Sequence, residues 1–329
     1  MIRLKRPSST LILLCCTLWA ATLQPACAQS PYPSRSPTII VPFAAGGGTD
    51  LLARFWGGAL QKELGQSFII DVRAGAGGVI GTRQAAQAQP DGYTLLIATP
   101  AFALNPFLVK DVGYDPVTSF QALAITGISP IAVVVPLDST IKTVRDIIER
   151  SRANPGVFNV GNAGQGSGGQ MAAAAFQAHT GVKFTEIPYK GAAPALVDLI
   201  GGRTQLQFEA FPSALPSIKA GKIRVIAVTP RKRSGLLPDT PTADESGAPG
   251  YEYSSWTGFM APAKTPRAIV DRLNAAFRKA LVDPAIIKGL ADSFGSDPGS
   301  GTPEEATAFV AAQYKENERL TRMIGLTPQ

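Results

Sequence analysis

The sequence is poor in the residue types that most catalytic and metal sites use. Its three cysteines all lie within the first 27 residues, and His179 is the single histidine in 329 residues. A Cys-His site is therefore excluded beyond residue 27, and a Ser-His-Asp site would have to use His179. That histidine stands near the expected end of a helix, where a basic group suits the helix terminus, so we expect it to be structural. We expect no metal site and no cofactor.

Long apolar runs and long runs of one charge are also missing beyond the N-terminus. The formal net charge is +7, and the three cations of residues 3–6 account for three of these charges, which leaves +4 for the rest. The densest basic cluster, Arg231–Arg233, is too short to indicate a nucleic-acid site. No later apolar run reaches the roughly 18 residues that a membrane span needs.

The first 28 residues have the layout of a secretory signal peptide. A basic segment at residues 3–6 precedes an apolar stretch, Leu11–Leu23, and a small-x-small cleavage site, Ala26–Ala28. We therefore expect cleavage after Ala28 and export to the periplasm. A lipoprotein anchored through Cys27 is disfavoured, because Gln24 and Pro25 stand where a lipobox prefers apolar and small residues.

Apolar runs and helical periodicities alternate along the remaining chain, which predicts parallel β-α-β units and an α/β fold. The alternation restarts near residue 130, which indicates two lobes, 36–129 plus 225–329 and 130–224, with a ligand cleft where their strand ends face each other. The expected strands are 38–42, 68–72, 93–98, 156–160, 182–189, 205–211 and 223–228, with a further apolar run at 130–136. The expected helices are 51–64, 82–89, 143–152, 171–180, 193–202, 212–221, 266–282 and 303–323.

The glycine-rich stretch RAGAGGVIG, Arg73–Gly81, lies between an expected strand and an expected helix, as a phosphate-binding loop would. A dinucleotide fingerprint requires Gly-x-Gly-x-x-Gly, and Ile80 occupies the position of the last glycine. The acidic residue that would bind the ribose is also out of place, because Asp91 sits in a turn before a strand. The stretch therefore favours a general anion-binding loop over a nucleotide site.

Three loops of this kind stand between a strand and a helix: FAAGGGTD, RAGAGGVIG and GNAGQGSGGQ. Successive glycines let backbone N–H groups converge beside a helix N-terminus, where they form an anion-binding hollow. Tight β-α connections with no ligand role are the alternative. Three such loops, split between two expected lobes, favour a cleft lined with backbone donors.

The carboxylates show no pairing that is diagnostic of acid/base catalysis. Asp50 is the most informative of them, because it follows a glycine loop at the start of an expected helix. It either caps that helix or contacts a polar or ammonium group of a ligand.

Several ordered motifs resemble the Bug receptors, the TctC-like solute-binding proteins of tripartite tricarboxylate transport systems. They are VPFAAGGGTDLLARFWGGALQKELGQSFIIDVRAGAGGVIG, AQPDGYTLLIATPAFALNP, VGNAGQGSGGQMAAAAF, IPYKGAAPALVDLIGGRTQLQF and the run from IKAGKIRVIAV to WTGFMAPAKTP. The resemblance extends over nearly the whole chain after residue 28.

The resemblance implies a monomeric periplasmic binding protein with a type II-like fold, whose two α/β lobes close on a small organic carboxylate. The ligand would be a di- or tricarboxylate, an acidic amino acid or an aromatic acid, delivered to membrane permease subunits. Two alternatives stay open: an orphan receptor that signals to a two-component sensor kinase, and a secreted or nucleotide-dependent enzyme. Neither a cofactor nor nucleic acid is expected.

The resemblance also implies which residues contact the ligand, because the family holds a carboxylate with backbone groups from loops of both lobes. In this sequence they are Phe43, Ala45, Gly46, Gly47, Asp50, Ala74, Gly75, Ala76, Gly77, Gly78, Thr99, Asn162, Gly164, Ser167, Gly168, Gln170, Tyr189, Lys190, Gly191 and Glu209.

Two departures from the family pattern affect the expected site. The second strand ends in Asp71-Val72-Arg73 in place of a Glu-Asn-Arg-like triplet, and Glu209 stands where the family often has an aspartate. Side chains near Glu209 are therefore expected to set ligand selectivity. Three aromatic residues, Phe43, Phe102 and Phe211, either favour a hydrophobic acid or belong to the core.

Overall fold

The computed structural model describes residues 32–164, 166–299, 301–323 and 328. The predicted signal peptide, residues 1–28, lies outside the described residues. The chain divides into Met1–Ser34 and Arg35–Gln329, and the description that follows concerns the second unit.

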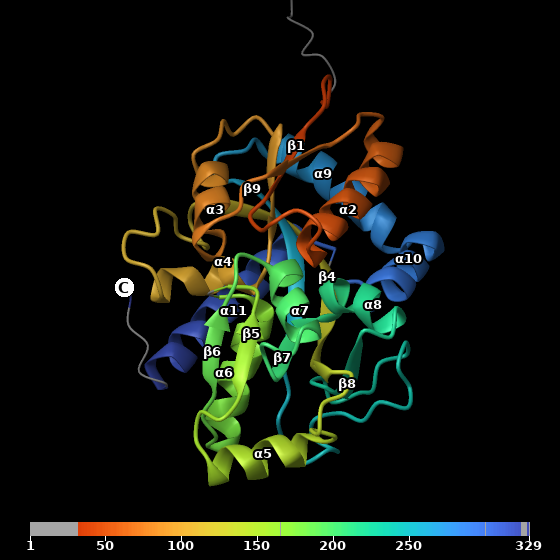
Figure 1. The fold of residues 1–329 in the computed structure, drawn as a ribbon. Helices are drawn as coiled ribbons and strands as arrows, with labels where there is room; N and C mark the ends of the chain where they lie inside the picture. The colour runs from red at the N-terminus through yellow and green to blue at the C-terminus, as the bar shows by residue number, and fades with distance from the viewer. Residues whose placement is uncertain (1–31, 165, 300, 324–327, 329) are drawn as a thin grey trace, which may run out of the picture. The chain divides into compact units, whose positions relative to one another are not determined.

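A first sheet contains strands from both ends of this unit (Figure 1). Strand β1 (Thr38–Val41) pairs in parallel with β2 (Ile69–Val72) and with β3 (Thr94–Ala98). The late strand β9 (Ser254–Pro262) pairs antiparallel with β3 and with the first part of β4 (Phe120–Pro136). The C-terminal part of the chain thus returns to the sheet that the N-terminal strands begin.

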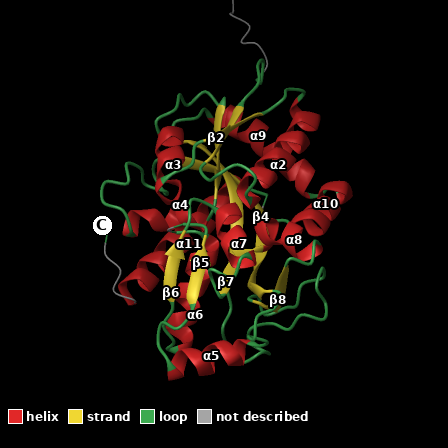
Figure 2. Ribbon diagram, in the orientation of Figure 1, coloured by secondary structure: helices red, strands yellow, loops and turns green. Residues whose placement is uncertain are grey.

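A second sheet grows from the other part of β4 (Figure 2). Strands β7 (Leu206–Ala210) and β8 (Ile223–Val228) both pair antiparallel with it. Beyond β7 follow β5 (Asn159–Asn162) and β6 (Thr185–Pro188), which are parallel to each other, with β5 also parallel to β7. Because β4 belongs to both sheets, it joins them in the strand order β2-β1-β3-β9-β4-β7-β5-β6.

The division into lobes 36–129 plus 225–329 and 130–224 stays a prediction. The chain passes from the first sheet to the second within β4, and it returns to the first sheet in the segment from β8 to β9.

Helices follow most of the strands in the described part of the chain. They are α2 (Gly48–Leu64), α3 (Val79–Ala86), α4 (Pro100–Leu104), α5 (Val144–Ala153), α6 (Gly168–Thr180), α7 (Ala192–Ile200), α8 (Phe211–Lys219), α9 (Arg267–Leu281), α10 (Pro284–Phe294) and α11 (Pro303–Met323), with short 3₁₀ turns at Ala76–Gly78 and Asn105–Phe107. No helix among the described residues is both long enough and apolar enough to cross a bilayer.

Local signals explain where several of these helices begin and end. Helix α2 ends at Gly65, whose left-handed conformation (φ 74°) lets its N–H donate to the Gln61 carbonyl. Helix α5 begins with a capping box, in which the Thr143 side chain accepts from Asp146 N–H and the Asp146 carboxylate accepts from Thr143 N–H. The predicted helix stop at Gly65 and helix start at Thr143 are confirmed.

Other expectations differ from the structure. The parallel arrangement holds for β1–β3 and β5–β7, but β4, β8 and β9 are antiparallel to their neighbours. The apolar run 130–136 is only the second part of a 17-residue strand. The strand expected at 156–160 begins at Asn159, and helix α10 was not expected. Strand β4 is buried along most of its length because it belongs to both sheets. Its sequence therefore shows no alternation of apolar and polar residues that would mark where the strand begins.

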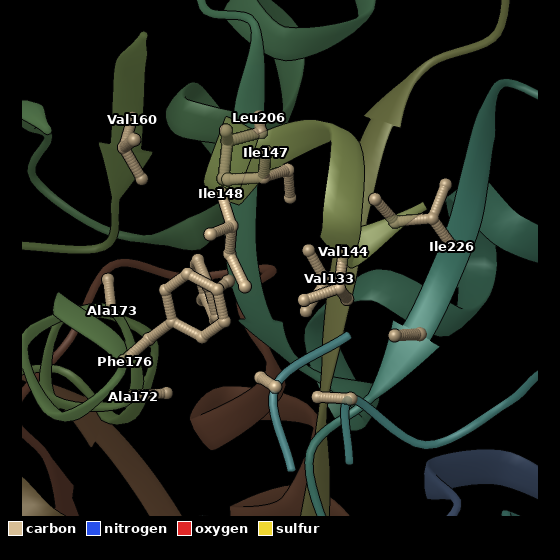
Figure 3. Packing of buried hydrophobic residues seen from close by; sticks show 14 of the residues in the cluster. Val133, Val144, Ile147, Ile148, Val160, Ala172, Ala173, Phe176, Leu206 and Ile226 are labelled. Carbon is tan, nitrogen blue, oxygen red and sulfur yellow. The ribbon is translucent and has the colours of Figure 1, made fainter. Parts of the chain in front are cut away.

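Each sheet has its own apolar packing. Beside the second sheet, Ile147 and Ile148 of α5 and Phe176 of α6 cluster with Val133 of β4 (Figure 3). Beside the first sheet, Trp56 of α2 packs against Phe277 of α9 with ring centroids 5.8 Å apart, and Phe259 of β9 lies 4.9 Å from Phe277. Burying each such side chain contributes roughly 1.5–3 kcal/mol, which holds the strand ends in fixed positions.

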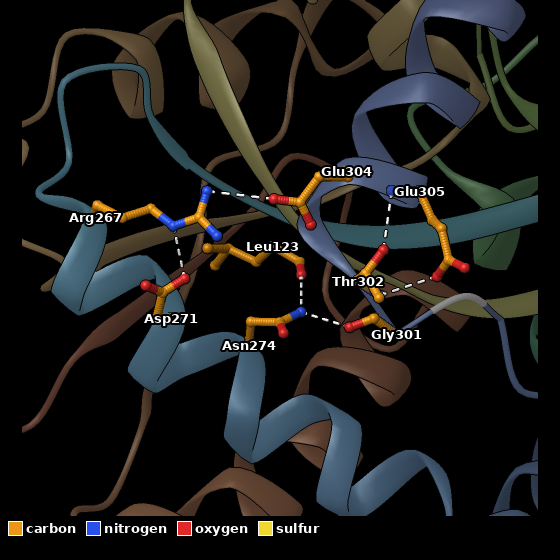
Figure 4. A network of polar contacts seen from close by, with 8 residues as sticks. All are labelled: Leu123, Arg267, Asp271, Asn274, Gly301, Thr302, Glu304 and Glu305. Carbon is orange, nitrogen blue, oxygen red and sulfur yellow. Dashed lines mark hydrogen bonds and ion pairs between the residues drawn. The ribbon is translucent and has the colours of Figure 1, made fainter.

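A buried polar contact fixes the C-terminal helices to the shared strand (Figure 4). Asn274 of α9 donates through Nδ2 to the Leu123 carbonyl of β4 at 2.8 Å and also to the Gly301 carbonyl just before α11. Arg267 of α9 pairs with Glu304 of α11 at 3.2 Å on the surface above. The start of α11 is therefore attached to the same strand that links the two sheets.

Candidate ligand-binding site

A cavity of about 70 Å³ lies where loops from both sheets meet, and we call it the helix-end pocket. Its walls come from the carboxyl ends of β1, β3, β5 and β7 and from the helices that follow them. This is where open α/β sheets place their ligands. The lining residues are Phe43, Ala44, Gly47, Gly48, Thr49, Leu52, Thr99, Ser129, Ala163, Ser167, Gly168, Gly169, Ala192, Glu209, Ala210, Pro212, Ser213, Ser255, Trp256 and Thr257.

The N-termini of several helices converge on this pocket. The N-cap residues of α2, α6 and α8, which are Gly47, Ser167 and Ala210, all line it, as does Ala192, the first residue of α7. The first N–H groups of a helix have no intrahelical acceptor, and the helix dipole is positive at that end. Since the lining contains no lysine, arginine or histidine, helix ends supply its positive potential.

Helices and loops attached to the two sheets contact each other at this pocket. Gly48 at the start of α2 donates its N–H to Ser213 Oγ of α8 at 3.2 Å. A Cβ built on Gly191, before α7, would stand 3.2 Å from Ala44 Cβ in the β1–α2 loop. Glycine at both positions lets these backbone segments approach each other closely.

The floor of the pocket consists of β4, which both sheets share, and its antiparallel neighbour β9. Ser129 of β4 and Ser255, Trp256 and Thr257 of β9 line it. Trp256 Nε1 and Thr257 Oγ1 are buried and have no hydrogen-bond partner in the structure. Buried polar groups are nearly always bonded, so these two atoms are exceptions in this strand.

Glu209 is the one ionisable residue in the lining, and its side chain is buried at the end of β7. Oε2 accepts from Gln207 Nε2 at 2.5 Å, and Oε1 accepts from the Ala210 N–H at 3.1 Å. Burial raises the pKa of the Glu209 carboxyl to about 7, although the hydrogen bonds from Gln207, Ala210 and Ser213 oppose the rise. Glu209 can therefore exchange a proton near neutral pH.

A second cavity, of about 190 Å³, lies beside the first, and we call it the glycine-loop pocket. Phe43 and Ala163 line both cavities. Gly75 and Gly164 in its wall have positive φ of 140° and 108°, which side chains disfavour. The lining residues are Pro42, Phe43, Gly75, Ala76, Gly77, Gly78, Ala163, Gly164, Pro188, Tyr189 and Lys190.

Residues 52–326 match the family described as the tripartite tricarboxylate transporter family receptor, TctC. The chain belongs to this TctC family. The predicted resemblance to Bug and TctC-like receptors is thereby confirmed, and the family is one of solute-binding receptors.

Solved structures share the fold of this TctC-family chain. Rpa4515 of R. palustris, solved with adipate, is 36% identical, with 91% of this chain and 100% of that chain covered and a TM-score of 0.87. The periplasmic binding protein BugD is 35% identical, with the same coverage and a TM-score of 0.85. MatC of Rhodopseudomonas palustris, solved with malate, is 29% identical over 88% and 99% of the chains, with a TM-score of 0.80. The predicted α/β periplasmic-binding fold is confirmed.

The residues that the resemblance implied fall into three groups in this TctC-family structure. Those in the helix-end pocket are Phe43, Gly47, Thr99, Ser167, Gly168 and Glu209, and those in the glycine-loop pocket are Phe43, Gly75, Ala76, Gly77, Gly78, Gly164, Tyr189 and Lys190. Seven line neither pocket: Ala45, Gly46, Asp50, Ala74, Asn162, Gln170 and Gly191. Ligand contact by any of these residues stays a prediction.

Several residues of the third group brace the loops from behind. Asp50 is buried, accepts from the Gly46 N–H at 2.9 Å and pairs with Arg54 at 3.1 Å. Asn162 accepts from the Gly164 N–H at 3.0 Å, and Gln170 accepts from the Gly166 N–H at 2.6 Å. These side chains hold the glycine loops in shape from the far side of the pocket wall.

Sequence reasoning missed the strand floor and the start of α8. Ser129, Ser255, Trp256 and Thr257 follow no glycine loop, and Ser213 lies inside a helix, so no motif marks any of them. The antiparallel pairing of β4 with β9 brings the four strand residues to the cavity, and the start of α8 after β7 brings Ser213 there.

The remaining residues singled out from the sequence, Phe102, Phe211 and His179, line neither pocket. Phe102 and Phe211 are buried; Phe102 packs against Tyr114 and Phe120. His179 Nε2 lies 2.8 Å from the Pro249 carbonyl oxygen, away from both pockets. No group of three or more His, Cys, Asp or Glu that could hold a metal occurs among the described residues.

Proposed function

We propose that this chain captures a small organic carboxylate in the helix-end pocket, with backbone N–H groups as the main donors. The observation that supports this proposal is the convergence of the N-termini of α2, α6, α7 and α8 on a pocket whose lining has no cationic side chain. Helix N-termini bind anions through their free N–H groups and their dipole. A pocket with this lining suits one carboxylate head.

Close backbone packing preorganises these donors. A Cβ built on Gly168 would stand 2.7 Å from Ser255 Oγ, and one built on Gly48 would stand 2.5 Å from Ser213 Oγ. The absence of a side chain at both positions therefore keeps the helix starts close to the strand floor. Donors that are already in place need no reorganisation when the ligand binds.

The ligand class follows from the relatives and from the second cavity. Rpa4515 and MatC were solved with adipate and malate, both dicarboxylates. In this chain the glycine-loop pocket adjoins the helix-end pocket at Phe43 and Ala163, and Lys190 lines it. We infer a ligand with one carboxylate at the helix ends and its other polar end toward the glycine-loop pocket.

The family description supports a role as the receptor of a tripartite tricarboxylate-type permease, to which the chain would deliver its ligand in the periplasm. We propose no catalysis, because the helix-end lining places no histidine, lysine or cysteine beside its serines to activate a nucleophile. Uptake of the bound acid by vesicles that contain the permease subunits, with and without this protein, tests the delivery step.

Binding itself is tested by calorimetry and thermal unfolding of the protein from Gln29 onward with mono-, di- and tricarboxylates. A ligand at 100 times its Kd should stabilise the folded state by about 2.7 kcal/mol. Adipamide, the uncharged diamide of adipic acid, is the matched control and should bind much more weakly than adipate. Absence of binding by every acid in the panel would contradict the proposal.

A further inference from the structure

Glu209 places a carboxyl group in a pocket that is otherwise built to receive a carboxylate. Its side chain lines the helix-end pocket and is 4% exposed. The hydrogen bonds that it accepts come from the Gln207 amide, the Ala210 N–H and the Ser213 hydroxyl, all of them neutral. A bound carboxylate would therefore share the pocket with a second acidic group.

Among the residues that the structure describes, no charged side chain offsets a negative charge on Glu209. Strands β4, β5 and β9, which surround it, contain no ionisable residue. On the helices that start at the pocket, Asp50 pairs with Arg54, Glu63 pairs with Lys279, and Lys62 lies in the last turn of α2, at the far end from the pocket. Asp198 of α7 contacts Tyr189 and Arg203, and Lys219 of α8 donates to the Asp292 carbonyl. His179 at the far end of α6 lies 2.8 Å from the Pro249 carbonyl oxygen, and Arg224 of β8 donates to the Ser139 and Ile141 carbonyls.

Two like charges in one cavity are avoided most readily when one of them takes up a proton. Paired carboxyl groups behave in this way, because the second ionisation is opposed by the first. The neutral acid then donates its O–H to the remaining carboxylate, which is a strong, charge-assisted hydrogen bond.

We propose that Glu209 takes up one proton from solvent when a carboxylate ligand enters the helix-end pocket and donates it in a hydrogen bond to that ligand. In this binding step, one receptor with ionised Glu209, one ligand anion and one proton combine to form one complex in which Glu209 is neutral. The inference rests on the proposed carboxylate-binding function and adds a selectivity device to it. An uncharged ligand brings no second negative charge, so protonation of Glu209 does not raise the affinity for it.

The pH dependence follows from the burial of Glu209, which sets the pKa of its carboxyl to about 7 in the free protein. The ligand anion raises this pKa further in the complex. Affinity should therefore be constant below about pH 7 and fall about tenfold per pH unit above it, until the pKa of the complex is reached. A ligand held only by helix ends would show no such fall.

The experiment measures proton uptake directly, with adipate, succinate and malate as probes. Calorimetry at about pH 8 in phosphate and in Tris, whose protonation enthalpies differ, gives the number of protons bound per ligand. We expect close to one proton bound per ligand for the wild type and close to zero for Glu209→Gln. The affinity of Glu209→Gln should no longer vary with pH. Glu252→Gln, which removes an exposed carboxylate paired with Arg231, is the control and should keep the proton uptake.

The outcomes separate this inference from the proposed function. Binding with no proton uptake in the wild type, or an equal pH dependence in Glu209→Gln, would overturn the role of Glu209 and leave carboxylate binding intact. No binding of any probe at about pH 6, where Glu209 is mostly protonated, would contradict both proposals.

Discussion

The helix-end pocket and the glycine-loop pocket are neighbours that share Phe43 and Ala163, yet they offer an anion different surroundings. The helix-end pocket is small, is lined by the starts of four helices of nine or more residues, and has one buried acid. The glycine-loop pocket is larger, and its one cation, Lys190, is exposed. The most conspicuous glycine motif of the sequence, RAGAGGVIG, therefore belongs to the pocket that we expect to attract an anion less strongly.

The difference comes from solvent. Charges near water interact at a high effective dielectric and are screened by salt, so an exposed lysine contributes on the order of 0–1 kcal/mol. Helix ends that face a pocket lined mostly by buried residues act at a lower dielectric and need no side-chain ordering. We therefore expect changes in the helix-end pocket to have the larger effects on binding.

The largest effect is expected from Gly168→Val at the start of α6. Its Cβ would meet Ser255 Oγ at 2.7 Å, so the side chain would occupy the space between helix and floor. Adipate affinity should fall by roughly 100-fold, or about 2.7 kcal/mol. The free energy of unfolding should fall by only about 1–2 kcal/mol. Gly58→Ala, on an open face of α2, is the control and should leave calorimetric affinity unchanged. If Gly168→Val and Gly58→Ala bound adipate with equal affinity, the helix-end pocket would not be the stronger of the two anion sites.

Glu209 should make stability depend on pH in the sense opposite to most carboxylates. Its pKa is 4.5 in the unfolded chain and about 7 in the folded protein, so the folded state binds more protons between these values. The stability of the wild type relative to Glu209→Gln is therefore greatest below pH 4.5 and falls by about 3 kcal/mol as pH rises to about 7. Urea unfolding of both proteins across this range measures the difference. A constant difference would show that Glu209 is not buried in the way described.

Gly77→Val tests the glycine-loop pocket. Gly77 has φ 62°, where an L side chain costs about 1–2 kcal/mol. We expect adipate affinity to fall about tenfold, which is less than the effect of Gly168→Val. Gly202→Val has the same kind of strain (φ 72°) in open space away from both pockets, so it should lower thermal stability without changing affinity. A larger loss in Gly77→Val than in Gly168→Val would reverse the ranking of the two pockets.

The smallest effect is expected from Lys190→Gln. Because Lys190 is exposed, its attraction to a bound dicarboxylate should change affinity by about two- to threefold at low salt and disappear at about 0.5 M salt. Lys222→Gln, an exposed lysine remote from both pockets, serves as the control in the same titrations. A loss of tenfold or more that persists in high salt would instead make Lys190 a principal anchor.

Much of the fold could be predicted because its signals are local. The stop at Gly65, the capping box of Thr143 and Asp146, and strand β8 at 223–228 each depend on a few neighbouring residues. The glycine loops were also visible, and most of the implied loop residues line one of the two pockets. The bracing role of Asp50 was less accessible, because a buried carboxylate that accepts from Gly46 cannot be told from a ligand contact by spacing alone.

The sequence by itself determined most of the helices and strands, the family to which the chain belongs and the loops that follow the parallel strands, because periodicity, caps and ordered motifs are short-range properties. Only the tertiary structure decided that β4 and β9 form a common floor, that four helix ends share one cavity, and that Glu209 is buried there without a cation. Glu209 shares its pocket with residues more than 150 positions away in the sequence, such as Gly48 at the start of α2, and its burial raises the pKa of its carboxyl. Long-range packing fixes such environments, and no local pattern contains them.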